Sequence, residues 1–380
     1  MDKIYTGIER RISPGDAHYF FGYFDKCPWN SRGEHLIHKV AFAGKHPRFG
    51  DVAEIGVINH GKFEKAAETL AWCWQQGAML QWFDDDRFIW NDTVGDRCIS
   101  RLSDGTVFEQ PVYTLSDDRS FALSLNFARL DAERPGYGYP GLADPAYDYA
   151  FPDFDGIYRL DFTTGKSKLI VSLQRLVDEF WDAGADRAIN WVNHLTISPD
   201  GKKIAFIHRW RSYEFAGRGR RSYITRMFVA DADGSNLWKL PLNRHASHYT
   251  WFAPDKLIVF SNNSDFGNQY RIYTVGNDRP EVFAPGRLPN DGHCSFSPDG
   301  KLLLTDSYPG KDHIRELVLY NPAKDERYSL GRYYSPDILQ PTRCDLHPRW
   351  SADGRRISFD SFHEKYRGTY VIDIPEDILR

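Results

Sequence analysis

The sequence predicts an all-β fold, a seven-bladed β-propeller made of four-stranded antiparallel blades. Three observations predict it: a repeated turn phrase, a second turn that follows most copies of it, and an aromatic content of 15%. Aromatic residues favour strands, and an aromatic-rich all-β core accounts for this share without any ligand. The chain has 41% hydrophobic and 26% charged residues, which is the composition of a globular protein and not of a disordered one.

The repeated phrase is clearest in SPDGKKIAF (198–206), SPDGKLLLT (297–305) and SADGRRISF (351–359). Each joins an Asp-Gly turn to alternating apolar residues, which is typical of a turn followed by a strand. Weaker copies bring the number to seven, with starts at residues 30, 84, 116, 198, 253, 297 and 351. Because a second turn follows most copies, each unit contains four strands, and seven such units predict seven blades.

The last unit shows only three strands, and we expect the N-terminal segment YTGIERRI (5–12) to supply the fourth and close the last blade. Residues 1–380 are therefore expected to form a single domain, with an inserted loop and helix at about 130–190. The insertion contains a stretch rich in Pro, Gly and Tyr (134–156) and an amphipathic segment, LQRLVDEFWDAG (173–184). It is interpreted either as a functional loop or as a clamp that packs over a hydrophobic patch.

Charge and cysteine usage exclude several classes of protein. The formal net charge of −4 argues against a nucleic-acid binder and against a membrane-surface protein. Five widely spaced cysteines imply no disulfide framework, and the charged N-terminus shows no signal peptide. We therefore expect a cytoplasmic protein, or a periplasmic or secreted one if a leader has been removed.

The common catalytic signatures are missing from the sequence. There is no GxSxG, P-loop, HExxH or CxxC motif. Gly136, Gly138 and Gly141 match GxGxxG, but Tyr and Pro separate them and no βαβ unit surrounds them, so the match is interpreted as accidental.

Histidines recur at one point of the repeat. His194, His293 and His347 each lie shortly before an Asp-Gly turn, and equivalent positions of different blades converge on one region of a propeller. The alternative is that duplication copied a structural histidine that bonds to the turn. That alternative explains less well the additional His208, His248 and Arg209.

A metal site is predicted where His347 follows Cys344 by three residues. With His293 from the preceding blade they form a Cys/His set that suits zinc, with manganese or calcium as alternative divalent ions. Gln340, Asp345 or a water would complete it. The alternative is a buried free cysteine beside a capping histidine.

The chain resembles the seven-bladed propeller polysaccharide lyases, which include oligogalacturonate lyase and the ulvan lyases of this architecture. The resemblance is carried by HCSFSPDGKLLLTDSYP, CDLHPRWSADGRRISFDSFHEKYRG and NHLTISPDGKKIAFIHRW, and by FGYFDKCPWN, QQGAMLQW and SLNFARLDAERPGYGY. It implies β-elimination next to a uronic acid, with an ulvan-like glucuronate- or iduronate-containing glycan as substrate. Cys344 and Arg349 depart from the ligands of oligogalacturonate lyase, which favours the structural metal of the ulvan-lyase branch.

Such an elimination needs a group that neutralises the uronate carboxylate, a base for the C5 proton and an acid for the leaving oxygen. The residues that the resemblance implies as catalytic are His194, His208, Tyr249 and Arg271. The candidates for substrate binding are Arg209, Arg244, His248 and Tyr137, and the candidate metal ligands are His293, Cys344 and His347. The expected partner is an acidic oligosaccharide.

Two other functions remain open from the sequence. One is a non-catalytic propeller that binds a glycan or a protein partner through its aromatic insertion. The other is a lyase-derived protein of exopolysaccharide synthesis or processing.

Overall fold

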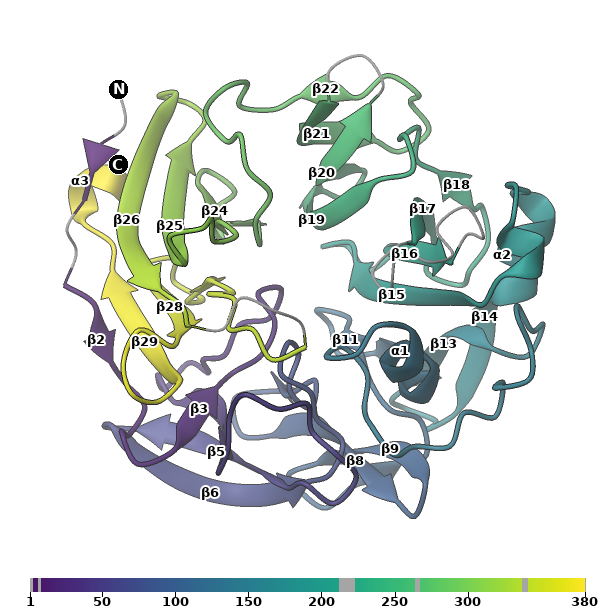
Figure 1. Cartoon of the computed structure of the whole chain (residues 1–380), viewed down its shortest axis with the longest axis horizontal. Coiled ribbons are helices and arrows are strands. Elements are labelled where there is room, and N and C mark those ends of the chain that lie inside the picture. The colour runs from purple at the N-terminus through teal and green to yellow at the C-terminus, as the bar shows by residue number, and fades with distance from the viewer. Residues whose placement is uncertain (1–2, 6–7, 212–222, 264–266, 337–340, 380) are drawn as a thin grey trace. The chain divides into compact units, whose positions relative to one another are not determined.

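The structure is a computed structural model that describes residues 3–5, 8–211, 223–263, 267–336 and 341–379. The described residues form seven sheets, six of four strands and one of five, in which successive strands of the chain pair antiparallel (Figure 1). This confirms the predicted seven-bladed β-propeller. None of the described helices is long and apolar enough to cross a membrane.

The chain divides into two compact units. The first contains residues 1–93, 101–107 and 286–380, and the second contains residues 94–100 and 108–285. The single domain over 1–380 stays a prediction. One sheet has residues in both units. Its strands are β7 (Gln81–Trp82), β8 (Phe88–Val94), β9 (Arg97–Leu102) and β10 (Val107–Phe108).

The first unit contains three whole sheets and the short helix α3 (Glu376–Leu379). The strands of its sheets are β3 (His18–Phe20), β4 (His35–Val40), β5 (Ala53–Asn59) and β6 (Lys62–Thr69); β1 (Lys3–Ile4), β26 (Glu326–Tyr334), β25 (Ile314–Asn321), β24 (Leu303–Asp306) and β23 (Ser295–Phe296); and β2 (Arg10–Arg11), β29 (Gly368–Asp373), β28 (Arg356–Ser361) and β27 (Arg349–Trp350).

The second unit also contains three whole sheets, with helices α1 (Phe127–Glu133) and α2 (Leu173–Glu179) and the 3-10 turn η1 (Ala185–Arg187). Its strands are β11 (Thr114–Leu115), β12 (Phe121–Ser124), β13 (Gly156–Asp161) and β14 (Ser167–Ser172); β15 (Asn190–Ile197), β16 (Lys203–Trp210), β17 (Ile224–Asp231) and β18 (Trp238–Lys239); and β19 (Ala246–Ala253), β20 (Lys256–Asn263), β21 (Gly267–Thr274) and β22 (Glu281–Val282).

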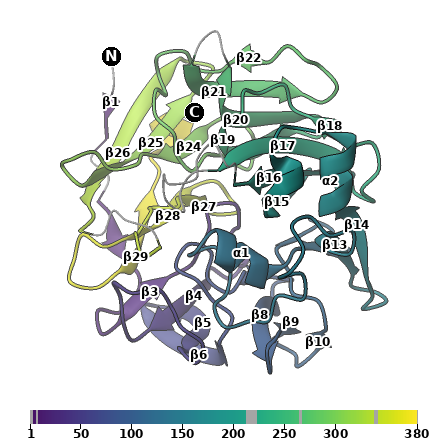
Figure 2. The same cartoon turned by 45° about the vertical axis from the view of Figure 1, so that its right-hand side comes forward.

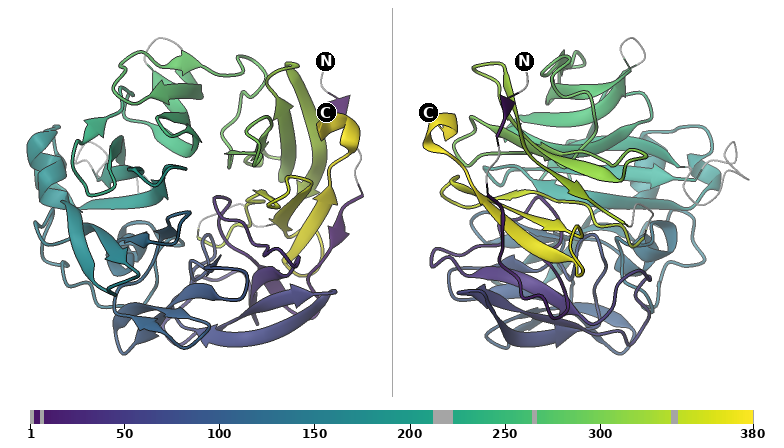
Figure 3. Two further views of the ribbon diagram at one scale, coloured as in Figure 1. Left: turned by 180° about the vertical axis from the view of Figure 1, so that it is seen from behind. Right: turned by 60° about the vertical axis from the view of Figure 1, so that its left-hand side comes forward.

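The N-terminal segment completes the last sheet, as predicted. β2 pairs antiparallel with β29 through Arg10↔Val371 and Arg11↔Tyr370. β1 adds a parallel fifth strand to β26. Figure 3 shows the purple N-terminal strands beside the yellow and lime C-terminal strands.

The repeated phrase is the turn between the first and second strands of each sheet, and the second turn joins the third and fourth strands. In the clearest copies, one serine ties the turn together. The Ser297 hydroxyl donates to Asp299 at 2.6 Å and accepts from the Leu302 backbone N–H at 3.0 Å. Ser198 and Ser351 make the same pair of bonds. Gly300 follows with φ +73°, a conformation that glycine adopts without strain.

Removing one of these hydroxyl groups is expected to weaken the fold slightly. Ser297→Ala breaks both bonds and should lower the free energy of unfolding by about 1–2 kcal/mol, measured by urea denaturation. Lys301→Ala is the control in the same turn, because its exposed ion pair with Asp299 contributes under about 1 kcal/mol. An equal loss in the two variants would contradict the structural role of the serine.

The hydrophobic core lies between neighbouring sheets of each unit. In the first unit, one cluster brings Phe20 of β3 together with Trp72, Trp74 and Trp90. In the second, Ala205 of β16 packs with Tyr249, Trp251 and Val259 of the next sheet. The high aromatic content is therefore explained largely by the core, as the sequence predicted.

The region predicted as one insertion is divided by β13 and β14 into two segments. Arg129 of α1 donates to the backbone carbonyls of Asn190, Ala146, Tyr149 and Ala150, which fastens the first segment to the start of β15. Arg226 of β17 donates to carbonyls of the second segment, and Figure 2 shows α2 beside β14 and β17. Both segments are thus packed against the sheets of the second unit, to which they belong.

Candidate functional site

A histidine pair lies in the interior of the first unit. His293 and His347 each precede a repeat-turn serine by four residues, and their side chains are about 1% and 0% exposed. Their ring centroids are 4.3 Å apart and the rings are perpendicular. Asp345 joins them, since one ligand atom from each of the three residues lies within 4.8 Å of the others.

Asp306, at the end of β24, holds both histidines. Its carboxylate accepts from the His293 backbone N–H at 2.8 Å, contacts His293 Nδ1 at 2.9 Å, and accepts from the His347 backbone N–H at 3.3 Å. A carboxylate on one ring nitrogen orients the other nitrogen toward a metal, which is the usual arrangement around metal-binding histidines. Nε2 of His293 is therefore the atom that a cation would meet.

The protonation state and the environment of the His347 ring are those expected of a metal ligand. Within the described part of the chain, neither of its ring nitrogens has a hydrogen-bond partner. Burial, reinforced by His293 and the neighbouring arginines, holds the pKa of His347 well below its usual range. A buried imidazole without hydrogen bonds is costly, and the neutral ring is the form that binds metals. The residues present thus fit a divalent cation.

Asp345 is an ionised carboxylate. Burial alone raises its pKa, but Arg343 and Arg315 hold that pKa well below its usual range. Arg343 Nε lies 2.6 Å from one oxygen and Arg315 Nη1 lies 2.7 Å from the other. Two His nitrogens and one carboxylate oxygen form a mixed donor set that suits first-row divalent metals.

Cys344 lies outside this group. Its Sγ approaches the backbone oxygen of Asp345 at 3.9 Å, and burial raises the pKa of the thiol to about 11. The grouping of His293 and His347 is thus the one that the sequence suggested, whereas the third member among the described residues is Asp345. Gln340, the other residue considered, lies outside the described residues.

Asp306 is the part of this centre that sequence analysis missed. The signal was present in the hairpin, because Ser295 pairs with Leu304 and the same register places residue 306 opposite residue 293. An acidic residue opposite the predicted ligand would have identified the carboxylate that orients it.

The residues predicted as catalytic lie in the second unit, and His194 is central among them. His194 of β15 is half-buried, with φ +53°, at an irregularity of the strand. Its backbone N–H donates to the Tyr113 hydroxyl at 3.1 Å, and its carbonyl accepts from the Tyr249 hydroxyl. The Tyr137 ring meets the His194 ring edge-on, with centroids 5.5 Å apart. The structure thus brings three predicted residues, His194, Tyr249 and Tyr137, together.

His208 is fully buried and bonded at both nitrogens. Arg226 Nη2 lies 2.9 Å from Nδ1 and can only donate, so Nδ1 accepts. Nε2 then carries the proton and donates to Asn190 Oδ1 at 2.9 Å. Burial and the charge of Arg226 hold the pKa of His208 well below its usual range. These contacts orient a neutral ring, and neither Asn190 nor Arg226 was predicted from the sequence.

Arg271 and Tyr249 are also held by the backbone. Arg271 is about 1% exposed, and its guanidinium donates to the carbonyls of Ser261 and Gly267 at 2.5 and 3.0 Å. Tyr249 is about 3% exposed, and its hydroxyl also contacts the Ala205 carbonyl at 3.1 Å. Both side chains are therefore engaged in stabilising their own unit.

Arg244 and His248 lie near the start of β19. Arg244 is at the surface and His248 is in the interior. Arg244, with φ +52°, pairs with Asp182 at 2.9 Å, which connects the second inserted segment to the start of β19. His248 is about 5% exposed, and its Nδ1 lies 3.2 Å from the Ser247 hydroxyl.

Arg209 is the predicted substrate-binding residue whose charge is least compensated. It is about 5% exposed, and its hydrogen bonds go to the neutral oxygens of Thr225 (3.2 Å) and Asn193 (3.3 Å). None of the described carboxylates forms an ion pair with it. Its guanidinium carbon lies 4.6 Å from the centre of the Tyr223 ring. A buried cation with neutral partners is typical of an anion-binding position.

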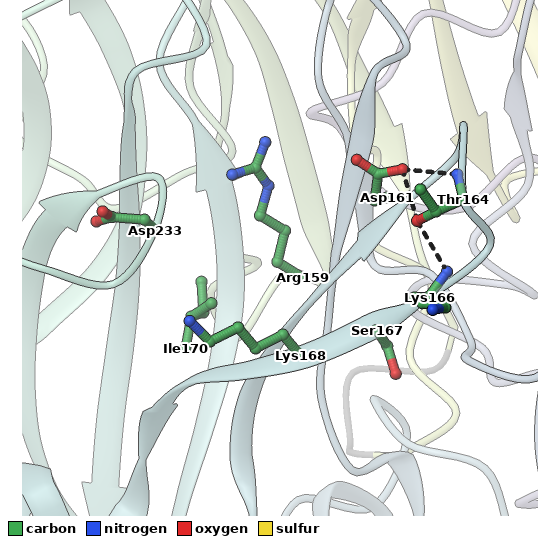
Figure 4. A pocket seen from close by; sticks show the side chains of 8 residues that line it. All are labelled: Arg159, Asp161, Thr164, Lys166, Ser167, Lys168, Ile170 and Asp233. Atoms are coloured by element: carbon green, nitrogen blue, oxygen red, sulfur yellow. Dashed lines mark hydrogen bonds between the residues drawn. The ribbon is translucent and has the colours of Figure 1, made fainter.

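A surface hollow of about 320 Å³ lies elsewhere on the second unit, on the β13–β14 hairpin. Figure 4 shows that Asp161 bonds within the turn, to Thr164. None of the residues predicted from the sequence lines it. Its lining consists of Arg159, Asp161, Thr164, Lys166, Ser167, Lys168, Ile170 and Asp233.

No protein-family model and no curated protein sequence matches the chain. Several solved structures, however, are similar to the chain. An oligogalacturonate lyase from Vibrio parahaemolyticus is 15% identical with a TM-score of 0.62, over 99% of this chain and 97% of that one. An oligogalacturonate lyase in complex with manganese is 16% identical with a TM-score of 0.65, over the whole of both chains.

A peptidase is similar as well. A puromycin-hydrolyzing peptidase from Mycobacterium tuberculosis is 11% identical with a TM-score of 0.53, over 98% of this chain and 55% of that one. At such identities the likeness shows the fold alone. The resemblance to propeller lyases that the sequence indicated is confirmed at that level.

Proposed function

We propose that the protein is a metal-dependent polysaccharide lyase that cleaves a glycosidic bond next to a uronic acid by β-elimination. The buried group of His293, Asp345 and His347, with Asp306 behind it, is the observation that carries the proposal. It is supported by the end-to-end likeness to two lyase structures, one of which holds manganese. The proposed substrate is an acidic oligosaccharide that contains glucuronate or iduronate.

In this proposal the three residues of the first unit hold a divalent metal, zinc or manganese. When bound, such an ion would supply the positive charge that holds the two imidazoles and the carboxylate together, which is the structural role that the resemblance implies. Asp306 keeps the His293 ring oriented, while Arg315 and Arg343 keep the Asp345 carboxylate ionised. We propose no direct role for the Cys344 thiol, because its Sγ is not among the grouped ligand atoms of His293, Asp345 and His347.

The proton transfers are assigned to the second unit. His194 is the proposed base, because it is half-buried while the rings of His208 and Tyr249 are fixed in the interior. It removes the C5 proton of the uronate, the electron pair forms the C4–C5 double bond, and the C4–O bond breaks. The leaving oxygen takes a proton from water. Arg209 neutralises the carboxylate, and His208, Tyr249 and Arg271 are positioning residues.

The decisive experiment is ultraviolet absorbance of the protein with a panel of uronate oligosaccharides. β-Elimination creates a conjugated uronate that absorbs, whereas hydrolysis does not. We expect the signal to rise with a glucuronate- or iduronate-containing substrate and to fall at least about 100-fold in His194→Ala. His60→Ala, at an exposed turn, is the matched control. A flat signal over the whole panel with metal bound would refute the proposal.

A second candidate function is favoured by exposed aromatic side chains of the inserted segment. Tyr147 is 76% exposed and Tyr149 is 54% exposed, and such rings commonly stack on sugars or bind partners. A non-catalytic propeller that binds a glycan through this segment would show no absorbance change. It would lose glycan binding when Tyr147 and Tyr149 are replaced by serine.

A further inference from the structure

The hollow on the β13–β14 hairpin is lined by more cations than carboxylates. Arg159, Lys166 and Lys168 carry positive charges, and Asp161 and Asp233 carry negative ones. Among the residues that the structure describes, no ion pair joins any of the three cations to a carboxylate. All of the lining lies in the second unit, and none of it has a role in the proposed reaction.

Two of the cations are direct neighbours across the hairpin. The register of β13 and β14 places Arg159 opposite Lys168. Such side chains lie on the same face of a sheet with their Cβ atoms about 5 Å apart, and like charges in this arrangement are destabilising. In Figure 4 both side chains lie between Asp233 on one side and Thr164 on the other. An anion bound at this point would relieve the repulsion between the two cations.

The guanidinium group of Arg159 is held in place by an aromatic ring. Its central carbon lies 4.1 Å from the centre of the Phe121 ring in β12. Its Nε is buried and has no hydrogen-bond partner within the described ranges of the chain. A guanidinium group on a ring face keeps its N–H groups in its own plane, where a carboxylate or a sulfate can accept two hydrogen bonds.

The two carboxylates of the hollow bond within their own turns. Asp161 accepts from the Thr164 backbone N–H at 2.7 Å and from its hydroxyl at 2.9 Å. Asp233 accepts from the Ser235 backbone N–H at 2.9 Å and from its hydroxyl at 2.6 Å. These bonds lower the pKa of both carboxyl groups. Both carboxylates are thus engaged in stabilising turns, and neither forms an ion pair with Arg159 or Lys168.

The wall between the two neighbouring sheets is fixed by a close approach of backbones. A Cβ atom on Gly234 would lie 2.1 Å from the Ile170 carbonyl oxygen, and Gly234 has φ +86°, so this position requires glycine. Arg175 Nη1 donates to the Gly234 carbonyl at 2.7 Å. The hollow is therefore formed before any ligand arrives.

The size and lining of the hollow suit one unit of an acidic sugar chain. Its volume of about 320 Å³ is at the lower end of the range for ligand pockets. Ser167 offers an exposed hydroxyl group, and Ile170 offers a partly buried apolar side chain. Salt screens exposed cations, so a single small anion gains little here. A polymer that the protein already binds elsewhere presents its charged groups at a high effective concentration and gains more.

We propose that the hollow is a second binding site for an acidic polysaccharide, apart from the residues of the proposed reaction. Arg159 and Lys168 bind the carboxylate or sulfate of one sugar unit, and Ser167 and Ile170 contact its ring. The inference rests on the proposed function for the class of polymer. A chain bound in this hollow stays attached to the protein between successive cleavages.

The test is native gel electrophoresis of the His194→Ala protein, which leaves the polymer intact, in gels that contain polyglucuronate, dextran sulfate or neutral dextran. Mobilities are compared with those in a gel without polymer. We expect at least one acidic polymer to retard the protein, and the apparent Kd to rise at least about tenfold in Arg159→Gln/Lys168→Gln. Arg187→Gln/Lys202→Gln is the control, because it removes the same two charges from exposed side chains of the second unit.

Lys168→Gln alone guards against a folding defect, since it changes only an exposed side chain and should give part of the loss. Retardation that depends on Arg159 and Lys168 supports the proposal, and the polymer that causes it identifies the acidic group. No retardation by either acidic polymer would overturn it. The same holds for unchanged retardation in the double variant, equal loss in the control, or equal binding of a single-stranded oligonucleotide.

The outcome is independent of the proposed reaction. If retardation depends on Arg159 and Lys168 while the natural protein eliminates no uronate, the second site stands and the proposed reaction fails. If a uronate is eliminated while the double variant is retarded as before, the reaction stands and the second site fails.

Discussion

Replacing His347 by alanine is expected to abolish metal binding and turnover together. The side chain is fully buried, neutral and without a hydrogen-bond partner among the described residues, so in the proposed function its main contribution is to bind the metal. We expect the metal content after dialysis against a weak chelator, measured by atomic emission, to fall from one ion per chain to nearly none. Turnover should fall by at least about 100-fold, since even partners of metal ligands contribute 10–100-fold.

Cys344→Ser is the matched control for this variant. It changes a fully buried neighbour three residues away without removing any member of the His293, Asp345 and His347 group. Metal content should stay near one ion per chain. Loss of metal in Cys344→Ser and its retention in His347→Ala would reverse the assignment. The same measurement with zinc and manganese supplied in turn identifies the ion.

The largest effect on stability is expected at Asp360 in β28. Its carboxylate is fully buried and accepts from Arg349 at 2.7 Å, from Thr369 at 2.8 Å and from the Phe21 backbone N–H at 3.3 Å. Arg367 lies 3.9 Å away. Asp360→Asn leaves two buried arginines without their counter-charge, so the free energy of unfolding should fall by about 3–5 kcal/mol in urea denaturation. Asp373→Asn, an exposed member of a surface pair in the same sheet, should lose less than about 1 kcal/mol.

This contribution should depend on pH. Burial raises the pKa of Asp360, but Arg349 and Arg367 lower it more, so its folded pKa lies below the usual value. The stabilisation is then fully present above about pH 4, the unfolded pKa, and is lost as pH falls through the folded one. The difference between the natural protein and Asp360→Asn should shrink in acid. A difference that stays constant down to acid unfolding would contradict the charge-based explanation.

The sequence predicted the fold because the fold repeats. Each copy of the Ser-x-Asp-Gly phrase places a turn at the same point of a sheet, and strand number follows from the spacing of turns. The pairing of His293 with His347 was predicted for the same reason, since equivalent positions of successive sheets lie close together. Asp345 was considered only as one of the groups that would complete the set beside Cys344, because spacing along the chain does not tell which of two adjacent side chains faces the histidines.

The surroundings of the proposed catalytic residues were less predictable. His208 and Arg271 are the residue types that an elimination needs, but the structure engages their polar atoms with Arg226, Asn190 and backbone carbonyls. Asn190 and Arg226 come from other strands than His208, and no local pattern reports them.

The pairing of β2 with β29 has a consequence for synthesis of the protein. About 360 residues separate these strands, so the first of them leaves the ribosome long before its partner exists. Until residues 368–373 emerge, the sheet that contains Asp360 cannot be completed, and the edge of β28 that pairs with β29 remains open to wrong pairing. Because loop closure over such a separation is slow, the final step of folding should be the capture of the N-terminal strand. Chaperones that shield strand edges during translation should therefore increase the yield of folded protein during synthesis. They should have little effect on the rate at which the full-length chain refolds, because β29 is then present from the start.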